Sequence, residues 1–206
     1  MCNTPLFAQP ATVFEHPNVK VLTASHKMIA VLPMKISYDE SALILEDEQI
    51  PKDSLATYAK RDALTCQRSM YHFLMRESGK AGMTVTVQDP DKTNLLMRRQ
   101  NISLDTLANF TKDEIAKMLE VDAVLFGEIH TDKILSQEVG LALVYFAGVN
   151  APNNESSGTF MLYEGQKGEL IWSFKKDISR GSFTDADALM DLLLKKTAKR
   201  FPYFKN

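Results

Sequence analysis

The sequence predicts an α/β fold, a three-layer mixed sheet in which a parallel β-α-β-α-β core is followed by an antiparallel hairpin and a C-terminal helix. Between Thr111 and Asp132, a capped amphipathic helix passes with almost no loop into a buried strand. Strand and helix patterns alternate before this segment, and two short strands joined by a glycine-containing turn follow it. Such alternation argues for right-handed parallel crossovers within one sheet.

The first two elements of the expected core are a buried strand and a long helix. Residues 27–36, KMIAVLPMKI, suit a buried strand that Pro33 closes, and residues 37–51 are read as an acidic, irregular connection. Apolar residues then recur at helical spacing from Ser54 to Ser78, which predicts a helix that packs by one face. Gly79 and Gly82 are expected to stop it.

The middle of the chain is expected to add two strands and the capped helix. Residues 83–88, MTVTVQ, alternate as a second strand, and residues 92–110 are read as a loop with a short helix. Thr111 and Glu114 have the spacing of a capping box, which starts the next helix. The run from Val121 to Ile129 is mostly apolar, so it suits a strand that is covered on both faces.

The pattern then changes to antiparallel strands. Residues 157–163 and 169–176 read as strands, and the turn EGQKG at residues 164–168 joins them. A final helix is expected to begin at Thr184 or Asp185 and to end at Phe201-Pro202.

Composition indicates one ordinary globular domain. The 206 residues are 45% hydrophobic and 24% charged, which is enough for a sizeable core. We expect residues 27–206 to form this single domain and residues 10–26 to be an N-terminal extension. The 24 Lys and Arg against 26 Asp and Glu give a net charge of −2, so no long-range field attracts nucleic acid and we expect no such partner.

Cysteine chemistry is not expected. The chain has two cysteines, Cys2 near its start and Cys66 at a core-facing position of the long helix. They support neither a disulfide framework nor a cysteine metal site. Cys66 is interpreted as a small buried hydrophobe, with a reactive thiol as the alternative. We expect no bound cofactor.

The first nine residues, MCNTPLFAQ, are interpreted as the remnant of a signal peptide, with small and apolar residues before a cleavage point after Ala8 or Gln9. This interpretation predicts an exported protein that is periplasmic or associated with the outer membrane. Acylation of Cys2 as the first residue of a lipoprotein is the alternative route.

Several segments carry a resemblance to a known family. They are IAVLPM at residues 29–34, the long helix, IAKMLEVDAVLFGEI at 115–129, TFMLYEGQKGELIWSFKKDI at 159–178 and the ending KKTAKRFPY at 195–203. In this order they resemble the CsgG-like group, which includes the subunit of the curli export channel. The amino-terminal domain of TolB and the LpoB and PelC lipoproteins share a similar fold. These are fold motifs and contain no catalytic signature.

The resemblance implies an exported domain, not an enzyme, that recognises other proteins of the cell envelope or helps to assemble an export apparatus. We therefore expect envelope proteins as partners. A homo-oligomer and a peripheral contact with the outer membrane are further expectations.

Motifs of catalysis are few. No serine lies in a Gly-x-Ser-x-Gly turn, and the chain has neither a Gly-x-Gly-x-x-Gly nor a Walker loop, so we assign no catalytic, cofactor-binding or metal-binding residue. Glu128, His130 and Asp132 alternate, so on an extended strand they would project from one face and could bind a metal. This pattern supports the alternative function, a metal-dependent hydrolase. The competing interpretation is a solvated strand end.

The segment that the fold explains least runs from Leu135 to Asn154. Its apolar residues leave no polar face, and glycines and a proline interrupt it. As a hypothesis, it forms an apolar patch that docks against a partner subunit or touches a membrane surface. The competing interpretation is a strand buried in the domain's own sheet. The interaction candidates are Val139, Leu141, Leu143, Tyr145, Phe146 and Val149.

Replacing Tyr145 and Phe146 by Ser separates these two interpretations. If the segment is a docking patch, the double variant should self-associate less while its thermal unfolding midpoint stays near that of the wild type. Light scattering across a concentration range measures the first quantity, and thermal denaturation measures the second. A large loss of stability would show that both side chains belong to the core.

Overall fold

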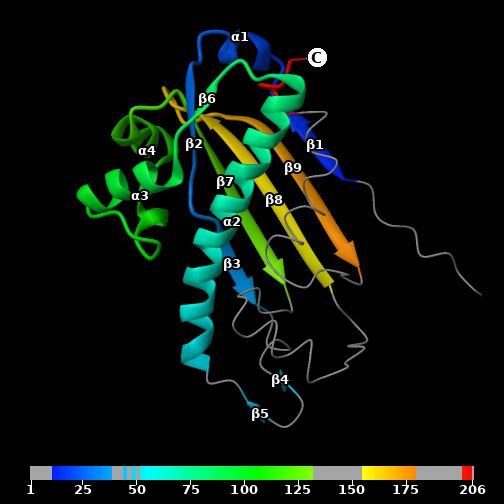
Figure 1. Cartoon of the computed structure of the whole chain (residues 1–206), viewed down its shortest axis with the longest axis vertical. Helices are drawn as coiled ribbons and strands as arrows, with labels where there is room; N and C mark the ends of the chain where they lie inside the picture. Colours follow the sequence, from blue (N-terminus) through cyan, green and yellow to red (C-terminus); the bar gives the residue numbers. More distant parts are fainter. Residues whose placement is uncertain are drawn as a thin grey trace, which may run out of the picture.

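The computed structural model describes residues 11–38, 44–45, 48–49, 52–131, 155–179 and 201–205. They form a mixed α/β fold around a seven-stranded sheet (Figure 1), whose strand order is β1-β9-β8-β7-β2-β6 with β3 also beside β7. The elements are β1 (Thr12–Glu15), α1 (Val19–Thr23), β2 (Met28–Val31), β3 (Lys35–Tyr38), β4 (Ile44–Leu45), β5 (Glu48–Gln49), α2 (Lys52–Ala81), β6 (Thr86–Val87), α3 (Pro90–Arg99), the 3-10 helix η2 (Leu107–Asn109), α4 (Lys112–Leu119), β7 (Ala123–Thr131), β8 (Glu155–Glu164) and β9 (Leu170–Ser179).

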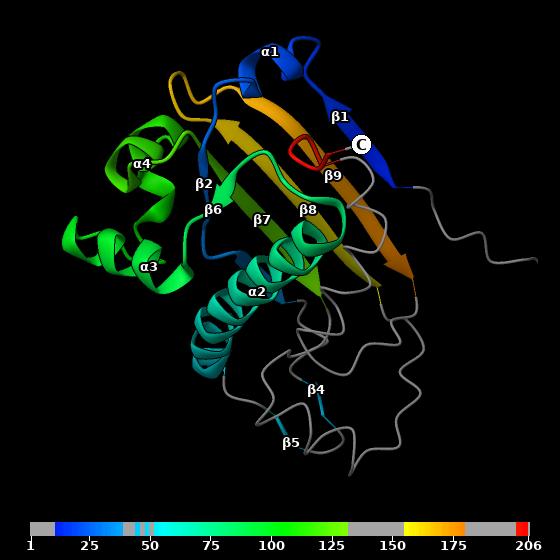
Figure 2. The ribbon, with the colours of Figure 1, turned by 45° about the horizontal axis from the view of Figure 1, so that its top comes forward.

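The parallel part of the sheet is built around β2, which lies between β6 and β7 and is parallel to both. Because β6 is added on one side of β2 and β7 on the other, right-handed connections require α2 and the pair α3–α4 to lie on opposite faces. Figure 2 shows α2 crossing the sheet with α3 and α4 apart from it. Two separate buried clusters follow, one that α2 contributes to and one that α3 and α4 contribute to. The expected β-α-β-α-β core is confirmed.

The first predicted strand, residues 27–36, is wrong as a single element. It is divided into β2 and β3, and Pro33 lies in the break between them. Proline has no N–H to donate, so it interrupts a hydrogen-bonded ladder. Both pieces pair in parallel with β7, β2 along its first part and β3 along its last part. The connection expected to be irregular at residues 37–51 also contains the end of β3 and the short antiparallel pair β4–β5.

Several other boundaries differ from the prediction. Helix α2 continues through Gly79 and ends just before Gly82, whose φ of +73° is the left-handed conformation common after a helix. The strand expected at residues 83–88 is shortened to β6. Helix α3 begins at Pro90, two residues before the expected loop, because the Asp89 carboxylate caps it by accepting the N–H groups of Asp91 and Lys92.

The capped helix and the strand after it are confirmed. The N–H of Thr111 donates to the Glu114 carboxylate at 2.8 Å, and the two residues form the predicted capping box at the start of α4. The helix ends at Glu120, whose φ of 56° is left-handed and turns the chain at once toward β7. This short connection places the buried face of α4 directly on the sheet.

The antiparallel hairpin β8–β9 is confirmed, and it extends the sheet beyond β7. Strand β1 then pairs with the outer edge of β9, with Phe14 opposite Ser173. The expected N-terminal extension, residues 10–26, thus contributes a strand and the short helix α1. Sequence reasoning did not identify either element, since a strand of four residues carries little periodicity.

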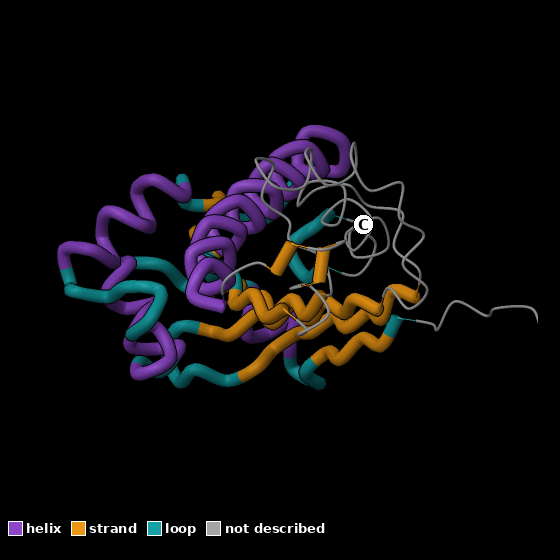
Figure 3. The backbone as a smooth tube through the Cα atoms, turned by 90° about the horizontal axis from the view of Figure 1, so that it is seen from below, coloured by secondary structure: helices purple, strands orange, loops and turns teal. Residues whose placement is uncertain are grey.

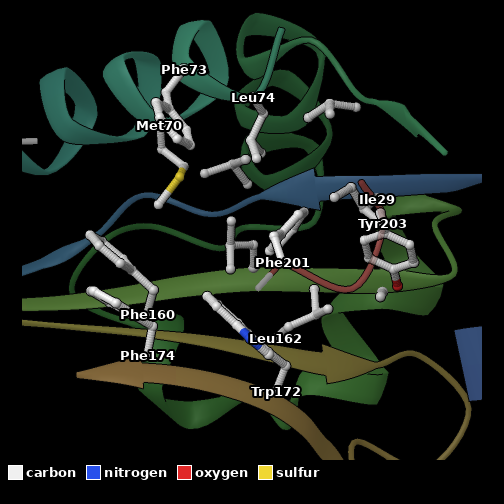
Figure 4. Close-up of a cluster of buried hydrophobic side chains, with 14 of the residues drawn as sticks. Ile29, Met70, Phe73, Leu74, Phe160, Leu162, Trp172, Phe174, Phe201 and Tyr203 are labelled. Atoms are coloured by element: carbon white, nitrogen blue, oxygen red, sulfur yellow. The ribbon is translucent and has the colours of Figure 1, made fainter. Parts of the chain in front are cut away.

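The larger core lies between the sheet and α2 (Figure 4), where side chains of α2 and the inward side chains of β8 and β9 belong to one buried cluster. Three aromatic residues near the end of the chain close it. The rings of Trp172 and Phe201 meet edge to face with centroids 5.3 Å apart, and Tyr203 and Phe204 lie beside Phe201. The fully or nearly fully buried side chains of this cluster include Met70, Phe73, Leu74, Phe160, Leu162, Trp172, Phe174, Phe201 and Tyr203. Aromatic edge contacts of this kind add to the hydrophobic stabilisation.

Two buried amide groups join the helices to the core. The Gln67 side chain of α2 donates to the carbonyl oxygen of Val31 at 2.8 Å and exchanges hydrogen bonds with Asn94 of α3. The Gln88 side chain donates to the carbonyl oxygen of Leu119 at 3.0 Å and accepts the hydroxyl of Thr93. Because buried amides are costly unless they are paired, these contacts hold α2, α3 and α4 in one arrangement.

Several predictions lie outside the described residues. They include the leader-like residues 1–9, the final helix from Thr184 or Asp185 up to residue 200, and the interaction candidates between Val139 and Val149. Among the helices that the structure describes, none has the length and apolar character needed to cross a membrane.

The turn between β8 and β9 packs against the junction of α4 and β7. The buried Glu164 carboxylate accepts the backbone N–H groups of Gln166 and Lys167 within the turn. The N–H of Gly165 donates to the carbonyl oxygen of Asp122 at 2.7 Å. A Cβ atom at Gly165 would lie 2.8 Å from that same oxygen and 3.0 Å from the Ala116 Cβ, so only glycine fits.

We therefore expect Gly165→Ala to lower the free energy of unfolding by about 1–3 kcal/mol, because the atoms it meets include rigid backbone. Denaturant unfolding followed by circular dichroism measures the change. The matched control is Gly79→Ala, because a Cβ there meets nothing within 4 Å and alanine favours a helix. Equal stability of Gly165→Ala and the wild type would contradict the tight packing of this turn.

Candidate interaction face

One face of the sheet formed by β7, β8, β9 and β1 is largely uncovered in the part of the chain that the structure describes. Helix α2 lies on one side of these strands (Figure 3), and α3 and α4 contact the other side only near the start of β7. From Phe126 to Thr131, partly or fully exposed residues alternate with buried ones. This is the pattern of a strand with one packed face and one open face.

The strand registers arrange the outward side chains in three rows, which together we call the open face. The first row is Phe14, Ser173, Met161 and Phe126; the second is Thr12, Lys175, Thr159, Glu128 and Lys35; the third is Asp177, Ser157, His130 and Ser37. The first row is mostly apolar, and its Phe14 ring is 42% exposed at the edge of the sheet. The second and third rows carry charges and hydroxyl groups.

A lysine borders the first row. The Lys112 ammonium, at the start of α4, lies 4.9 Å from the ring centroid of Phe126 and 6.0 Å from that of Tyr163, which are cation–π distances. Burial lowers the pKa of Lys112, and the nearby charge of Glu128 opposes the shift. Burial also raises the pKa of Tyr163, and Glu128 adds to that shift. The hydroxyl of Tyr163 points along β8 and donates to the Met161 sulfur at 3.3 Å.

The charged rows contain short-range pairs within the chain. The Lys35 ammonium is 3.7 Å from the Glu128 carboxylate, and the Lys175 ammonium is 3.9 Å from the Asp177 carboxylate. All four side chains are about half or more exposed, so such pairs add little to stability. The charges therefore determine the electrostatic pattern of the face more than they determine the fold.

A second polar group lies at the end of the sheet where β2 and β7 begin. The Asp122 carboxylate accepts the backbone N–H groups of Lys27 and Met28 at 2.7 and 2.9 Å. Burial, the largest single cause, would raise the pKa of Asp122, but these two N–H groups together with the charges of His26 and Lys27 outweigh it, and the net shift is downward. Asp122 also joins β2 through its own N–H, which donates to the carbonyl oxygen of Met28 at 2.8 Å.

His26 and Tyr203 complete this polar end. The His26 Nδ1 lies 2.6 Å from the Tyr203 hydroxyl. Burial lowers the pKa of His26 against the opposing charges of Asp122 and Glu164, and burial is also the main reason that the pKa of Tyr203 is raised. The described contacts of these side chains tie the beginning of β2 to the end of the chain, so we assign the group a structural role.

The structure tests only part of the alternative metal site. Glu128 and His130 do lie on the same face of β7, while Asp132 lies outside the described residues. Glu128 is paired with Lys35, and His130 Nδ1 is 3.1 Å from the Ser37 hydroxyl. Within the described ranges, no group of three or more His, Cys, Asp or Glu side chains is placed to hold a metal ion.

Apart from Glu128 and His130, sequence reasoning did not single out the residues that make up the open face. The alternation in TFMLY at residues 159–163 was a usable signal, because it places Thr159, Met161 and Tyr163 on one face of β8. No comparable signal existed for Phe14 or Lys112. Their positions depend on the pairing of β1 with β9 and on the packing of α4.

We expect Asp122→Asn to lower the free energy of unfolding by about 1 kcal/mol near neutral pH, because charged acceptors bind N–H groups more strongly than neutral ones. The depressed pKa of Asp122 means that the carboxylate contributes stability above the unfolded-state pKa, and that this contribution is lost as the pH falls through the folded-state pKa. The difference between wild type and variant should therefore shrink below about pH 4. Urea unfolding at several pH values measures it, and a difference independent of pH would contradict the assignment.

No family model matches the chain, and no curated protein matches it. Solved structures do. Lipoprotein GNA1162 from Neisseria meningitidis has 13% identity and a TM-score of 0.45, with 84% of this chain and 94% of that chain covered. A PelC dodecamer from Paraburkholderia phytofirmans has 14% identity and a TM-score of 0.41, with 96% and 98% covered. LpoB from E. coli has 12% identity and a TM-score of 0.42, with 80% and 65% covered. The matches include LpoB and PelC, the two lipoproteins of the sequence resemblance.

Proposed function

We propose that this chain is an exported, non-enzymatic protein of the cell envelope that acts through protein–protein contacts in the assembly or export of envelope components. The open face is the observation that carries the proposal. It offers a broad surface across adjacent strands, with apolar groups in its first row and charged groups in the other two. Export rests on the leader-like residues 1–9, which predict a periplasmic or outer-membrane-associated protein.

The composition of the open face suits a protein partner. Aromatic residues and methionine are enriched in the centres of interfaces, and Phe14, Met161 and Phe126 supply them. Charged residues at the margin contribute orientation and association rate more than affinity. The Lys112 ammonium lies over the Phe126 ring, so it places a positive charge beside the apolar first row, where it can meet an acidic group of a partner.

The segment from Val139 to Val149 is a second proposed contact. In sequence it lies in the connection between β7 and β8, two paired strands of the open face. We propose that its apolar residues add to contacts with an envelope protein, with another copy of the chain, or peripherally with the outer membrane. We also propose that residues 27–206 form a single domain.

A photo-crosslinking amino acid placed at Phe14 tests the function in the cells that make the protein. We expect a covalent adduct with another envelope protein, because Phe14 is an exposed aromatic residue on the open face. The matched control position is Val21, which is 75% exposed on α1 and lies outside the rows of the open face. Gel electrophoresis and mass spectrometry identify the adducts, and cell fractionation establishes where the protein resides.

Two outcomes would contradict the proposal. One is a protein found only in the cytoplasmic fraction. The other is a set of adducts that is the same from Phe14 and from Val21, because it would show that the open face has no preferred partner.

A further inference from the structure

We propose that the second and third rows of the open face bind the same rows of a second copy of this chain. This inference deepens the proposed function, since it names one partner of the open face. The observation behind it is the arrangement of charge on β7 and β9. On β7 the acidic Glu128 is followed by His130, and on β9 the basic Lys175 is followed by the acidic Asp177.

These four side chains form a rectangle. Glu128 and His130 lie along β7, Lys175 and Asp177 lie along β9, and β8 runs between the two pairs. Glu128 and Lys175 share the second row through Thr159, and His130 and Asp177 share the third row through Ser157. Acidic groups therefore stand at one pair of diagonal corners, and a lysine and a histidine stand at the other. A pattern of this kind is complementary to itself when one copy is turned over onto another about a two-fold axis in the plane of the sheet.

The position of α4 determines which direction of the two-fold axis is sterically possible. Helix α4 stands on the open side near the start of β7, and its Lys112 reaches over Phe126 in the first row. An axis parallel to β8 would press α4 against β1 and β9 of the second copy, because two sheets pack only about 10 Å apart. An axis across the strands, between the second and third rows, moves the two α4 helices to opposite ends of the interface.

With the axis across the strands, every second-row residue faces a third-row residue of the other copy on the same strand. Lys175 faces Asp177, Glu128 faces His130, and Thr159 faces Ser157, each pair occurring twice by symmetry. Lys35 faces the hydroxyl of Ser37 and therefore meets no like charge. Lys175 and Asp177 bring opposite charges together twice, and Glu128 faces an imidazole and no acidic group, so the arrangement gives specificity for this partner.

The size of the surface predicts a weak dimer. Four strands spaced about 4.8 Å apart, with two rows about 7 Å apart along each strand, span on the order of 270 Å² in projection. Stable interfaces bury about 800 Å² on each partner. We therefore expect a dissociation constant in the micromolar range or weaker, with a dimer that forms as the concentration is raised.

Charge reversal tests the pairing on the whole chain. Sedimentation or light scattering across concentrations up to about 1 mM gives the dissociation constant. Lys175→Glu places two acidic groups opposite each other, and Asp177→Lys places two basic groups opposite each other. Each should weaken the dimer at least about tenfold, consistent with like charges in contact. Combining both changes exchanges the charges and should return the dissociation constant to within about threefold of the wild type.

The matched control is Lys20→Glu, an equal change of charge on the exposed surface of α1. It should leave the dimer unchanged. Urea unfolding of each variant shows that the fold is retained. A chain that stays monomeric throughout the range, or a dimer that Lys175→Glu leaves intact, would overturn the inference. A dimer lost only in the Tyr145→Ser and Phe146→Ser variant would also overturn it.

The axis has its own test. In a background with Cys2→Ser, the variants Thr159→Cys and Ser157→Cys are prepared separately and treated with a short bifunctional thiol reagent, which the buried Cys66 does not reach. An axis across the strands predicts that a mixture of the two variants crosslinks more than either one alone. Crosslinking of Thr159→Cys alone would place the axis along β8 and overturn the assigned geometry.

The two proposals can fail separately. A monomer in solution that still forms adducts from Phe14 with another envelope protein would remove the dimer and leave the proposed function. A dimer that is weakened by one charge reversal and restored by both, in a protein found only in the cytoplasm, would remove the proposed function and leave the dimer. The Phe14 position lies in the first row, outside the charged pairs, so the two readouts are independent.

Discussion

The attachment of Asp122 to the start of β2 is the contact on which the rest of the sheet depends. Its carboxylate accepts two backbone N–H groups of β2, its own N–H donates to Met28, and its carbonyl oxygen accepts the N–H of Gly165. One residue therefore joins the parallel core, the end of α4 and the turn between β8 and β9. Because a shift by one residue would move every side chain to the opposite face, this anchor also determines which residues are outward.

The open face is a consequence of that register together with the handedness of the crossovers. Right-handed connections place α2 over the inner face, and α3 and α4 cover only the part of the outer face near β2. Within the described ranges, no helix packs on the outer face of the added antiparallel strands beyond the start of β7. Their outer face therefore keeps the mixture of Phe14, Met161 and paired charges that both proposals use.

The features predicted correctly are those whose interacting residues lie close together in the sequence. The Thr111 capping box, the entry from α4 into β7 and the β8–β9 hairpin were all predicted, because each depends on residues a few positions apart. The strand predicted at residues 27–36 was wrong as one element, since Pro33 admits both a strand end and a break. Strand β1 was missed because its four residues become a strand only through pairing with β9.

By itself, the sequence determined the mixed α/β class, the order of the core elements and the lack of a catalytic motif, since local patterns of hydrophobicity, capping and turns encode them. Only the tertiary structure decided that Phe126 lies beneath Lys112 and that Lys175, Thr159 and Glu128 form one row. These neighbours are far apart in the chain. Strand register and helix packing bring them together, and neither is written in the periodicity of any single segment.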